Sequence, residues 1–514
     1  MKKTITLFLM LLCLSFASAQ EKTINEITSF KIRNSGTLMD KTNNVDGYYF
    51  FYEVDKLKKG QKEYAIQILD NNLNDVATKS YVDNKNTFLV QSKFNNQALI
   101  FAMTNYKEKF YKLITFDRQA NQVENIQIPV SKKEMRWLNA MKQTGNFNFL
   151  FPVDNKGFLF NYVRDNSKLG YGLKYVPTDG GTGWDYNSPE DSKLIHTLNP
   201  IEANEEVVVA LEGTKKSLLS QTINYKVIVL DIKTGAFLFE SKFDRKDNPR
   251  LVTNAFLTPE KNLVLLGEYF EAGDNIMKDK SLGLFSETLD LKGNIVSDSK
   301  ISWVDKIDPM MPAEIDGKKK KKRGYIYFHD IVRTQKGTYY AIGERYRKTA
   351  SAGGIAAMAL SGGRSGNSVT QLTITNAAIF EFDEKFNLTD IKVFEKGKSR
   401  APSITDFGSP QLNAHVLKSF GAFDYEFTQL DQKRDRFYAT FIDYERLKGQ
   451  KNKTAFKTVM YNAGSFSEDK IYLQEDKGRT QYRVMPGKLG NVMLLEYNKK
   501  DKTVQLHLEK LNVQ

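Results

Sequence analysis

Short apolar runs, each introduced by polar or turn-forming residues, recur along the chain at a spacing of about 50 residues. Each run holds about five successive apolar positions, the pattern expected of a β-strand that is covered on both faces. The copies are DGYYFFYEV (46–54), NQALIFAMT (96–104), KGFLFNYVR (156–164), EEVVVALEG (205–213), KNLVLLGEY (261–269), KGTYYAIGER (336–345), RDRFYATFI (434–442) and GNVMLLEYN (490–498). The pattern therefore predicts eight equivalent buried strands.

A second strand follows each buried strand, and in several copies it ends in an Asp. YAIQILD (64–70), YKLITFD (111–117) and YKVIVLD (225–231) share a Tyr, alternating apolar residues and this Asp. Asn or Gly stands four residues later, as in DNNLN (70–74) and DIKTG (231–235), and a third strand follows. The Asp can accept hydrogen bonds from the turn's amides, and Asn or Gly tolerates positive φ where the chain reverses. A calcium loop needs more oxygen ligands than these turns offer, so we interpret the aspartates as structural.

A unit of strand, strand, Asp turn and strand with this period is typical of β-propeller blades. We therefore predict an all-β fold, a single β-propeller of eight four-stranded antiparallel blades over residues 21–514, with seven blades as the alternative. A pair of β-sandwiches is the other possibility, and the regular turn motif argues against it. Between Gly337 and Arg436 the spacing grows to 99 residues. Residues 411–430 are therefore predicted to be a degenerate blade or part of an insertion.

The last unit ends soon after its second strand, so its blade lacks an outer strand. ITSFKIRNSG (27–36) is a spare strand at the other end of the chain. We predict that this N-terminal strand completes the last blade, because the pairing would remove two exposed sheet edges.

The first twenty residues have the pattern of a cleaved secretory signal peptide. Lys2 and Lys3 precede an apolar run over residues 5–16 and small residues at 17–19. The run is shorter than the roughly 20 apolar residues that a membrane anchor requires. We therefore expect an exported protein, periplasmic or extracellular, and exclude residues 1–20 from fold reasoning.

The chain's single cysteine, Cys13, lies inside this apolar run. A lipoprotein would have a small residue immediately before the lipidated cysteine, and Leu12 stands there, so a lipoprotein is not expected. The mature chain would then contain no cysteine, which excludes disulfides, thiolate metal sites and cysteine nucleophiles.

Charge and composition indicate a basic globular protein. The chain carries 75 Lys and Arg against 61 Asp and Glu, a formal charge of +14. Removing Lys2 and Lys3 leaves 73 against 61, or +12. Hydrophobic residues make up 41% and aromatic residues 12%, which excludes a disordered chain. The positive charge favours non-specific attraction to acidic surfaces.

The signal peptide, the repeated apolar strands and the Tyr–Asp–Asn/Gly units together resemble uncharacterised exported proteins of Bacteroidota-type bacteria with a β-propeller-like fold. The similarity covers most of the chain after residue 20. Its motifs are structural, so the resemblance implies a fold and a destination and transfers no functional residue.

The four histidines, His196, His329, His415 and His507, lack the spacing of two, three or four residues that would place two of them on one metal. We therefore predict neither a metal site nor a cofactor. His329 is a candidate ligand-binding residue because Asp330 follows it, although neighbours on a strand point to opposite faces. Nucleophile-elbow, P-loop and dinucleotide motifs are absent from the sequence.

Three segments are candidate binding elements. The loop over residues 177–192 contains Trp184 and Tyr186, which could stack on a sugar, with Asp185 between them. Its alternative interpretation is a Gly-rich surface loop. The small-residue segment 349–370 is interpreted as a mobile or disordered insertion, with a lid or partner-binding segment as the alternative.

The third segment is a run of cations within a predicted insertion over residues 304–324. The run consists of Lys318, Lys319, Lys320, Lys321, Lys322 and Arg323. A solvated loop is the simpler interpretation, and the alternative is a salt-sensitive site for an acidic polymer. Aromatic residues do not alternate with these cations, so specific nucleic-acid binding is not expected.

The sequence favours an exported, non-enzymatic β-propeller that acts as a binding module at the cell envelope. An acidic polysaccharide, lipopolysaccharide or an envelope protein is the expected partner, and the oligomeric state is open. The alternative is a polysaccharide-processing enzyme, of the glycoside hydrolase or lyase type, with carboxylates in the central funnel. The fold alone does not decide between them, because propellers host unrelated functions.

Overall fold

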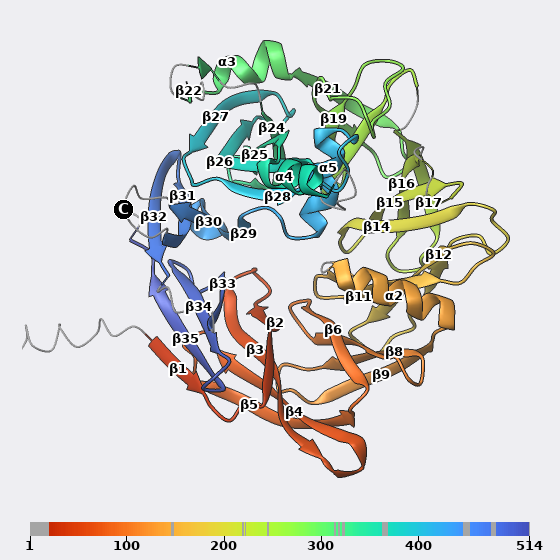
Figure 1. The fold of residues 1–514 in the computed structure, drawn as a ribbon, viewed down its shortest axis with the longest axis vertical. Helices are drawn as coiled ribbons and strands as arrows, with labels where there is room; N and C mark the ends of the chain where they lie inside the picture. Colours follow the sequence, from red (N-terminus) through yellow and green to blue (C-terminus); the bar gives the residue numbers. More distant parts are fainter. Residues whose placement is uncertain are drawn as a thin grey trace, which may run out of the picture. The chain divides into compact units, whose positions relative to one another are not determined.

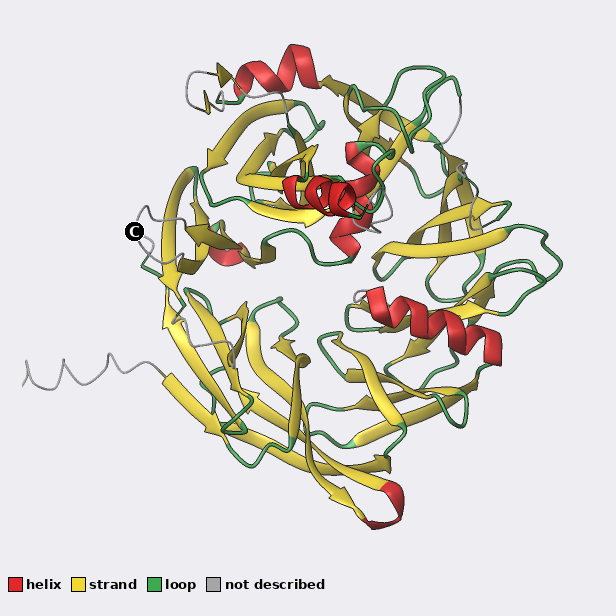
Figure 2. Ribbon diagram, viewed as in Figure 1, coloured by secondary structure: helices red, strands yellow, loops and turns green. Residues whose placement is uncertain are grey.

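A computed structural model describes residues 20–144, 149–217, 220, 223–243, 246–312, 315–316, 319–320, 324–361, 368–445, 453–473 and 480–512. The described chain is dominated by strands, with few helices (Figures 1 and 2). Eight antiparallel sheets of four strands are present, one of them extended by a short fifth strand. These sheets are the blades of a β-propeller, so the predicted fold and blade number are confirmed. The chain divides into two compact units.

The first unit contains blades one and eight. Blade one consists of β2 (Ser29–Met39), β3 (Val45–Leu57), β4 (Gln61–Asp70) and β5 (Asp75–Asn84), with the short helix η2 (Lys58–Gly60) between β3 and β4. Blade eight consists of β33 (Thr480–Pro486), β34 (Asn491–Asn498), β35 (Thr503–Lys510) and β1 (Gln20–Ile24).

The N-terminal strand completes blade eight, as predicted, but it is a different segment from the one expected. β1 runs antiparallel to β35, with Gln20 opposite Leu508 and Ile24 opposite Val504 (Figure 1). Residues 27–36 instead lie largely in β2, the first strand of blade one. Phe30 is buried in that unit's core, which fixes this segment in blade one.

The second unit contains blades two to seven. Blade two consists of β6 (Thr87–Phe94), β7 (Leu99–Asn105), β8 (Phe110–Phe116) and β9 (Gln122–Pro129). Blade three consists of β10 (Leu150–Val153), β11 (Gly157–Arg164), β12 (Gly170–Pro177) and β13 (Asp185–Asn187). Blade four consists of β14 (Ile195–Ala203), β15 (Val207–Lys215), β16 (Asn224–Asp231) and β17 (Phe237–Lys242). Helix α2 (Lys132–Thr144) follows β9.

Blade five consists of β18 (Arg250–Leu257), β19 (Leu263–Tyr269), β20 (Gly283–Leu289) and β21 (Ile295–Ser302). Blade six consists of β24 (Tyr325–Arg333), β25 (Tyr339–Ala350), β26 (Thr370–Phe382) and β27 (Leu388–Phe394), and β28 (Ser399–Pro402) also pairs with β26. Blade seven consists of β29 (Tyr425–Asp431), β30 (Arg436–Glu445), β31 (Lys453–Asn462) and β32 (Ser465–Tyr472). A short helix, η4 (Gln432–Arg434), joins β29 to β30.

The repeated apolar run is the second strand of each blade, not the first. β7 shows why the pattern is strong there, since every one of its residues is buried. The first strands mix buried and half-buried positions, as in β24, and leave no comparable signature in the sequence. The predicted repeat therefore began one strand too late within each blade.

The Asp turns form as predicted, with one difference. Where Asn is the last residue of the motif, the residue before it adopts the positive φ, and the Asn itself does not. In the turn after β20, Asp290 Oδ1 accepts hydrogen bonds from the backbone amides of Lys292 and Asn294. The Asn294 side-chain amide donates to Asp290 Oδ2 at 2.8 Å. Gly293 takes the positive φ of +86°. Asn is therefore selected here for its side-chain hydrogen bond rather than for its backbone conformation.

Two of the long connections contain helices. Helix α4 (Ala352–Leu360) lies within segment 349–370, where a mobile or disordered insertion is predicted; residues 362–367 lie outside the described residues. Ser351 caps its first turn by accepting a hydrogen bond from the Gly354 amide, and alanines favour the helix. Residues 411–430 are not a degenerate blade: they fall in helix α5 (Pro410–Ser419) and β29.

The predicted Lys-rich insertion begins with the π-helix η3 (Trp303–Ile307) and the short helix α3 (Asp308–Met310). A small hairpin of β22 (Ile315–Asp316) and β23 (Lys319–Lys320) follows. Among the residues that the structure describes, none of the helices has the length and apolarity needed to cross a membrane. Residues 1–19 lie outside the described residues.

We expect Ile24→Ala to lower the free energy of unfolding by about 2–5 kcal/mol, because it opens a cavity where β1 meets the core. Ile24 is buried beside Leu506 and Leu508. Chemical denaturation monitored by tryptophan fluorescence measures the change. Thr23→Ala, at the exposed neighbouring position, should leave the denaturation midpoint unchanged; an equal loss in both variants would contradict the packing role of β1.

We also expect the Asp290 turn to make stability depend on pH. The hydrogen bond from the Asn294 side chain, followed by that from the Asn294 backbone amide, holds the pKa of Asp290 below its usual range. Because the folded-state pKa is lowered, this contribution is present above the unfolded pKa, near 3.8, and is lost as pH falls through the folded value.

Asp290→Asn should therefore lower Tm at pH 7, with a difference that shrinks as the pH falls below about 3.8. Thermal melts at several pH values test this. Asp298→Asn on β21 is the matched control, since Asp298 is exposed. A pH-independent difference would show that the carboxylate charge does not stabilise the turn.

Candidate functional site

A polar cavity of about 530 Å³ lies in the second unit, at the edges of blades three and four. Six consecutive strands, β12 to β17, contribute to its wall, and one polar side chain from each is important for its chemistry. These side chains are Tyr171, Tyr186, His196, Glu212, Lys226 and Glu240. We call this space the tyrosine cavity.

Glu212 is the residue around which this wall is built. Its carboxylate is almost fully buried, and Oε1 accepts a hydrogen bond from the Tyr171 hydroxyl at 3.0 Å. His196 Nδ1 lies 3.1 Å from the same oxygen. Lys226 stands opposite Glu212 on the neighbouring strand and reaches Oε2 at 2.8 Å. The carboxylate is therefore paired on both oxygens, as a buried charge requires.

The same wall carries a second ion pair towards solvent. Lys226 Nζ also lies 2.8 Å from Glu240 on β17. Burial lowers the pKa of Lys226, but the hydrogen bonds to Glu212 and Glu240 outweigh it and raise the pKa above its usual value. Burial likewise raises the pKa of Tyr171 and Tyr186, so both hydroxyls stay protonated and can donate hydrogen bonds.

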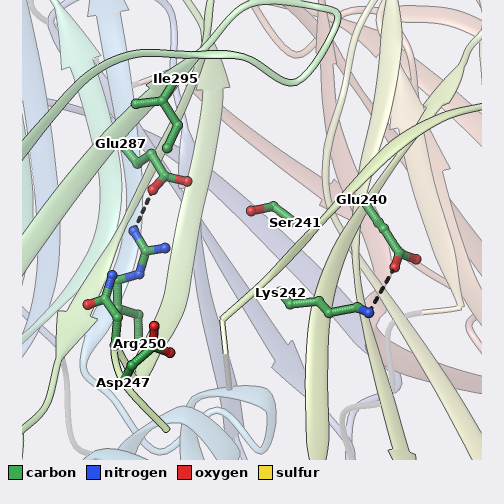
Figure 3. A pocket seen from close by; sticks show the side chains of 8 residues that line it. Glu240, Ser241, Lys242, Asp247, Arg250, Glu287 and Ile295 are labelled. Atoms are coloured by element: carbon green, nitrogen blue, oxygen red, sulfur yellow. Dashed lines mark hydrogen bonds and ion pairs between the residues drawn. The ribbon is translucent and has the colours of Figure 1, made fainter. Parts of the chain in front are cut away.

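A second cavity, of about 410 Å³, lies between the edges of blades four and five (Figure 3). We call it the arginine cavity. Arg250 and Glu287 form an ion pair on one wall, and Glu240 and Lys242 form a pair on the other, with Ser241 between them (Figure 3).

The ion pair of Arg250 is held in a fixed position by aromatic rings. Its guanidinium carbon lies 4.6 Å from the centre of the Phe243 ring and 5.0 Å from that of Phe285. Glu287 is buried, and among the described residues its Oε1 has no hydrogen-bond partner. A buried acceptor without a partner is unfavourable, so a donor that reached this oxygen would stabilise the wall.

The two cavities share Glu240 and Lys242, so they lie against the same edge strand, β17. A third cavity, of about 250 Å³, shares Arg250 and Glu287 with the arginine cavity and extends to Lys300 on β21. Together they form a polar groove across the edges of blades three to five, which we call the edge groove.

The residues predicted from the loop 177–192 divide between the groove and the core. Tyr186 lies on β13 and lines the tyrosine cavity. Asp185 is exposed on the same strand and pairs with Lys174 at 2.9 Å. Trp184 is half-buried: its indole N–H donates to the Ile232 carbonyl at 2.8 Å and its ring stacks on Tyr175. Trp184 therefore packs blade three against blade four.

His329 belongs to a buried cluster in blades six and seven, outside the edge groove. Its ring stacks on Tyr425 with centroids 4.8 Å apart, and Nε2 lies 3.0 Å from Glu344 Oε2. Glu344 also pairs with Lys396 at 2.8 Å, and Lys396 pairs with Asp424. The side chains of His329, Glu344 and Lys396 are 0% exposed, so the cluster joins two blades within the core.

Burial, followed by the charge of Lys418, lowers the pKa of His329 to about 4, so the imidazole is neutral at pH 7. A β-bulge between Phe328 and Asp330 breaks the strict alternation of β24. Asp330 consequently also reaches Tyr425, whose hydroxyl donates to Oδ2 at 3.2 Å. Histidine and aspartate thus meet at one tyrosine although they are neighbours on a strand.

Two residues of the cationic run lie in the small hairpin. In its strand register Lys319 lies opposite Asp316, and Lys320 lies opposite Ile315. Lys318, Lys321, Lys322 and Arg323 lie outside the described residues. Within the described ranges, no group of three or more His, Cys, Asp or Glu side chains is placed to hold a metal ion.

Sequence reasoning missed Glu212, but the repeat contained the signal that marks it. A Glu follows the apolar run of the second strand in five of the eight copies, at Glu53, Glu212, Glu268, Glu344 and Glu496. A charge at the end of a strand covered on both faces must find buried partners. Following that position through the repeat would have led to both the tyrosine cavity and the His329 cluster.

Comparison with known proteins shows the family but no activity. A family model matches residues 1–512. The chain belongs to the DUF6770 family, a family of unknown function. No curated protein sequence matches this DUF6770 chain.

Solved structures similar to the DUF6770 chain include propeller-containing peptidases. Prolyl oligopeptidase B from Galerina marginata matches with a TM-score of 0.40 and 11% identity, over 93% of this chain and 55% of that chain. The β-propeller domain of the Trilobed protease from Pyrococcus furiosus matches with a TM-score of 0.36 and 9% identity, over 83% and 94%. The chain thus spans about half the length of the oligopeptidase, and these values support no inference about activity.

We expect Lys396→Met to destabilise the DUF6770 protein by about 3–5 kcal/mol, because it leaves Glu344 and Asp424 buried without their shared cation. Urea denaturation measures the loss. Lys392→Met, at an exposed lysine on β27, is the matched control and should change stability by less than about 1 kcal/mol. Equal effects would show that the buried cluster does not stabilise the packing of the blades.

Proposed function

We propose that this DUF6770 protein is an exported binding module that holds a glycan chain in its edge groove. The observation that carries the proposal is the sharing of Glu240 and Lys242 by two polar cavities, which makes one groove across adjacent blade edges. Export rests on the signal-peptide pattern of residues 1–20.

The chemistry of the groove fits sugar hydroxyls better than an apolar ligand. Each hydroxyl both donates and accepts hydrogen bonds, and the walls alternate carboxylates with cations. Glu287 offers an unpaired acceptor, while Lys226 and Lys300 offer donors. Tyr186 adds an aromatic surface on which a sugar ring can lie. Because both signs of charge are present, a neutral or mildly acidic glycan is the favoured ligand.

Binding to a glycan array, followed by calorimetry on the best ligand, tests this proposal. Tyr186→Ala and Glu287→Gln should each weaken binding at least about tenfold, or about 1.4 kcal/mol, because one removes the stacking surface and the other the acceptor charge. Tyr472→Ala, at a half-exposed tyrosine of blade seven, should bind like the wild type. Unchanged affinity in both groove variants would overturn the assignment of the edge groove.

The same array separates the groove from the cationic run. Replacing Lys318 to Lys322 by Ser should leave groove binding unchanged. An acidic polymer or lipopolysaccharide bound only at low salt, and lost in that variant, would instead place the ligand on the cationic run.

A second candidate function, cleavage of a polysaccharide by a carboxylate pair, is favoured by Glu202 on β14. Burial raises the pKa of Glu202, a hydrogen bond from Asn204 opposes the rise and the charge of Asp154 adds to it, which together give a pKa of about 7. A carboxyl group protonated near neutral pH can act as a general acid. Release of reducing ends from a bound glycan, abolished in Glu202→Gln, would support this function over simple binding.

A further inference from the structure

A serine, a histidine and a glutamate form a hydrogen-bonded chain, and the histidine and the glutamate line the tyrosine cavity. Ser192 Oγ lies 2.7 Å from His196 Nε2. His196 Nδ1 lies 3.1 Å from Glu212 Oε1. The order of contacts is hydroxyl, Nε2, Nδ1 and carboxylate, which is the arrangement that activates a serine nucleophile.

The neighbouring groups determine which way each proton points. The Leu194 backbone amide donates to Ser192 Oγ at 3.1 Å, so the serine oxygen already accepts one hydrogen bond and its own proton is available to His196. Glu212 can only accept when ionised, so His196 carries its proton on Nδ1. Nε2 is then the bare nitrogen that faces Ser192.

Three side chains hold the Glu212 carboxylate in place. The Tyr171 hydroxyl and Lys226 Nζ bind the carboxylate at 3.0 Å and 2.8 Å, in addition to His196. Its side chain is 5% exposed, whereas Ser192 is half-exposed at the start of blade four. A buried carboxylate therefore orients a histidine whose serine partner is accessible to solvent.

We propose that Ser192 is a catalytic nucleophile, with His196 as its general base and Glu212 as a positioning residue, and that the site hydrolyses carboxylic esters. The adjoining cavity of about 530 Å³, lined by His196 and Tyr186, gives the substrate room beside the base. We take the natural ester to be an O-acyl sugar. That choice rests on the proposed glycan function, but the acyl-transfer chemistry does not.

The reaction balances without a cofactor. Ser192 Oγ forms a bond to the ester carbon while its proton passes to His196 Nε2. The ester C–O bond then breaks, and the departing alcohol takes that proton. Water next gives a proton to His196 and its hydroxyl to the acyl carbon, the Oγ–carbon bond breaks, and Ser192 regains its proton. The products are the alcohol and the carboxylic acid.

A fluorophosphonate probe tests the nucleophile without any knowledge of the natural substrate. We expect the intact protein to be labelled on the peptide that contains Ser192, as identified by mass spectrometry, and labelling to be lost in Ser192→Ala. Ser297→Ala, at an exposed serine of β21, is the matched control and should be labelled like the wild type. Labelling elsewhere, or none in the folded wild type, would overturn the proposal.

Hydrolysis of p-nitrophenyl acetate tests the base and its positioning partner. His196→Gln should reduce the serine-dependent rate to that of Ser192→Ala. Glu212→Gln should lower kcat by more than about 100-fold with KM unchanged, since it removes the orienting charge and leaves the cavity in place. A fall explained by unfolding, seen as a matching loss of β-sheet circular dichroism, would overturn the positioning role.

The outcomes separate this activity from glycan binding. Esterase activity and Ser192 labelling without any glycan bound would support the nucleophile and reject the proposed ligand. Glycan binding that is retained in Ser192→Ala, with no labelling of the wild type, would reject the nucleophile and keep the proposed function.

Discussion

The whole structure depends on one constraint: the second strand of each blade is covered on both faces. Such a strand has no solvent side, so any polar residue in it is buried; every residue of β7 is buried, and its first five, Leu99 to Met103, are apolar. The Glu that recurs at the end of this strand therefore has a carboxyl group that is buried away from water. Glu53, Glu212, Glu268 and Glu344 are all at most 7% exposed, and each must be neutralised, paired or protonated.

The blades satisfy this requirement in different ways. Glu344 is surrounded by His329 and Lys396, and that pairing closes it off from solvent. Burial raises the pKa of Glu268 to about 8, so it keeps its proton at neutral pH, and the partners that hold it, such as Ser281, are neutral. Glu212 differs from both, because its partners His196 and Lys226 border a cavity. One position in the repeat thus gives a buried structural bridge in blade six and a carboxylate beside a cavity in blade four.

How much of this the sequence could predict depends on whether the signal is local. The fold, the number of blades and the Asp turns rest on local patterns, such as the apolar run of residues 99–103 and the Asn294 that holds Asp290, and these were predictable. The first strands were not, because they alternate burial without a fixed motif. The edge groove was predictable only through Tyr186.

The remainder of the site depends on contacts that sequence spacing does not show. Ser192 and His196 are four residues apart, but their relation to Glu212 comes from the pairing of β14 with β15, which places His196 opposite Thr214. Trp184 shows the opposite error. Its aromatic ring in a Gly-rich loop suggested a surface on which a ligand could stack, but its indole N–H donates to the Ile232 carbonyl. A bulge at His329 had no visible cause in the sequence, yet it decides which side chains meet at Tyr425.

The pairing of β1 with β35 has a consequence for the order in which this chain can fold. Residue 20 leaves the ribosome 488 residues before its partner, residue 508. At about 5–20 residues per second, synthesis of the intervening chain takes roughly 25–100 s. During that time the apolar side chain of Ile24 and the open edge of its strand have no partner, and an open edge can pair with other chains. This blade therefore cannot be completed until β35 has been synthesised, and a chain cut short anywhere before residue 503 cannot complete it.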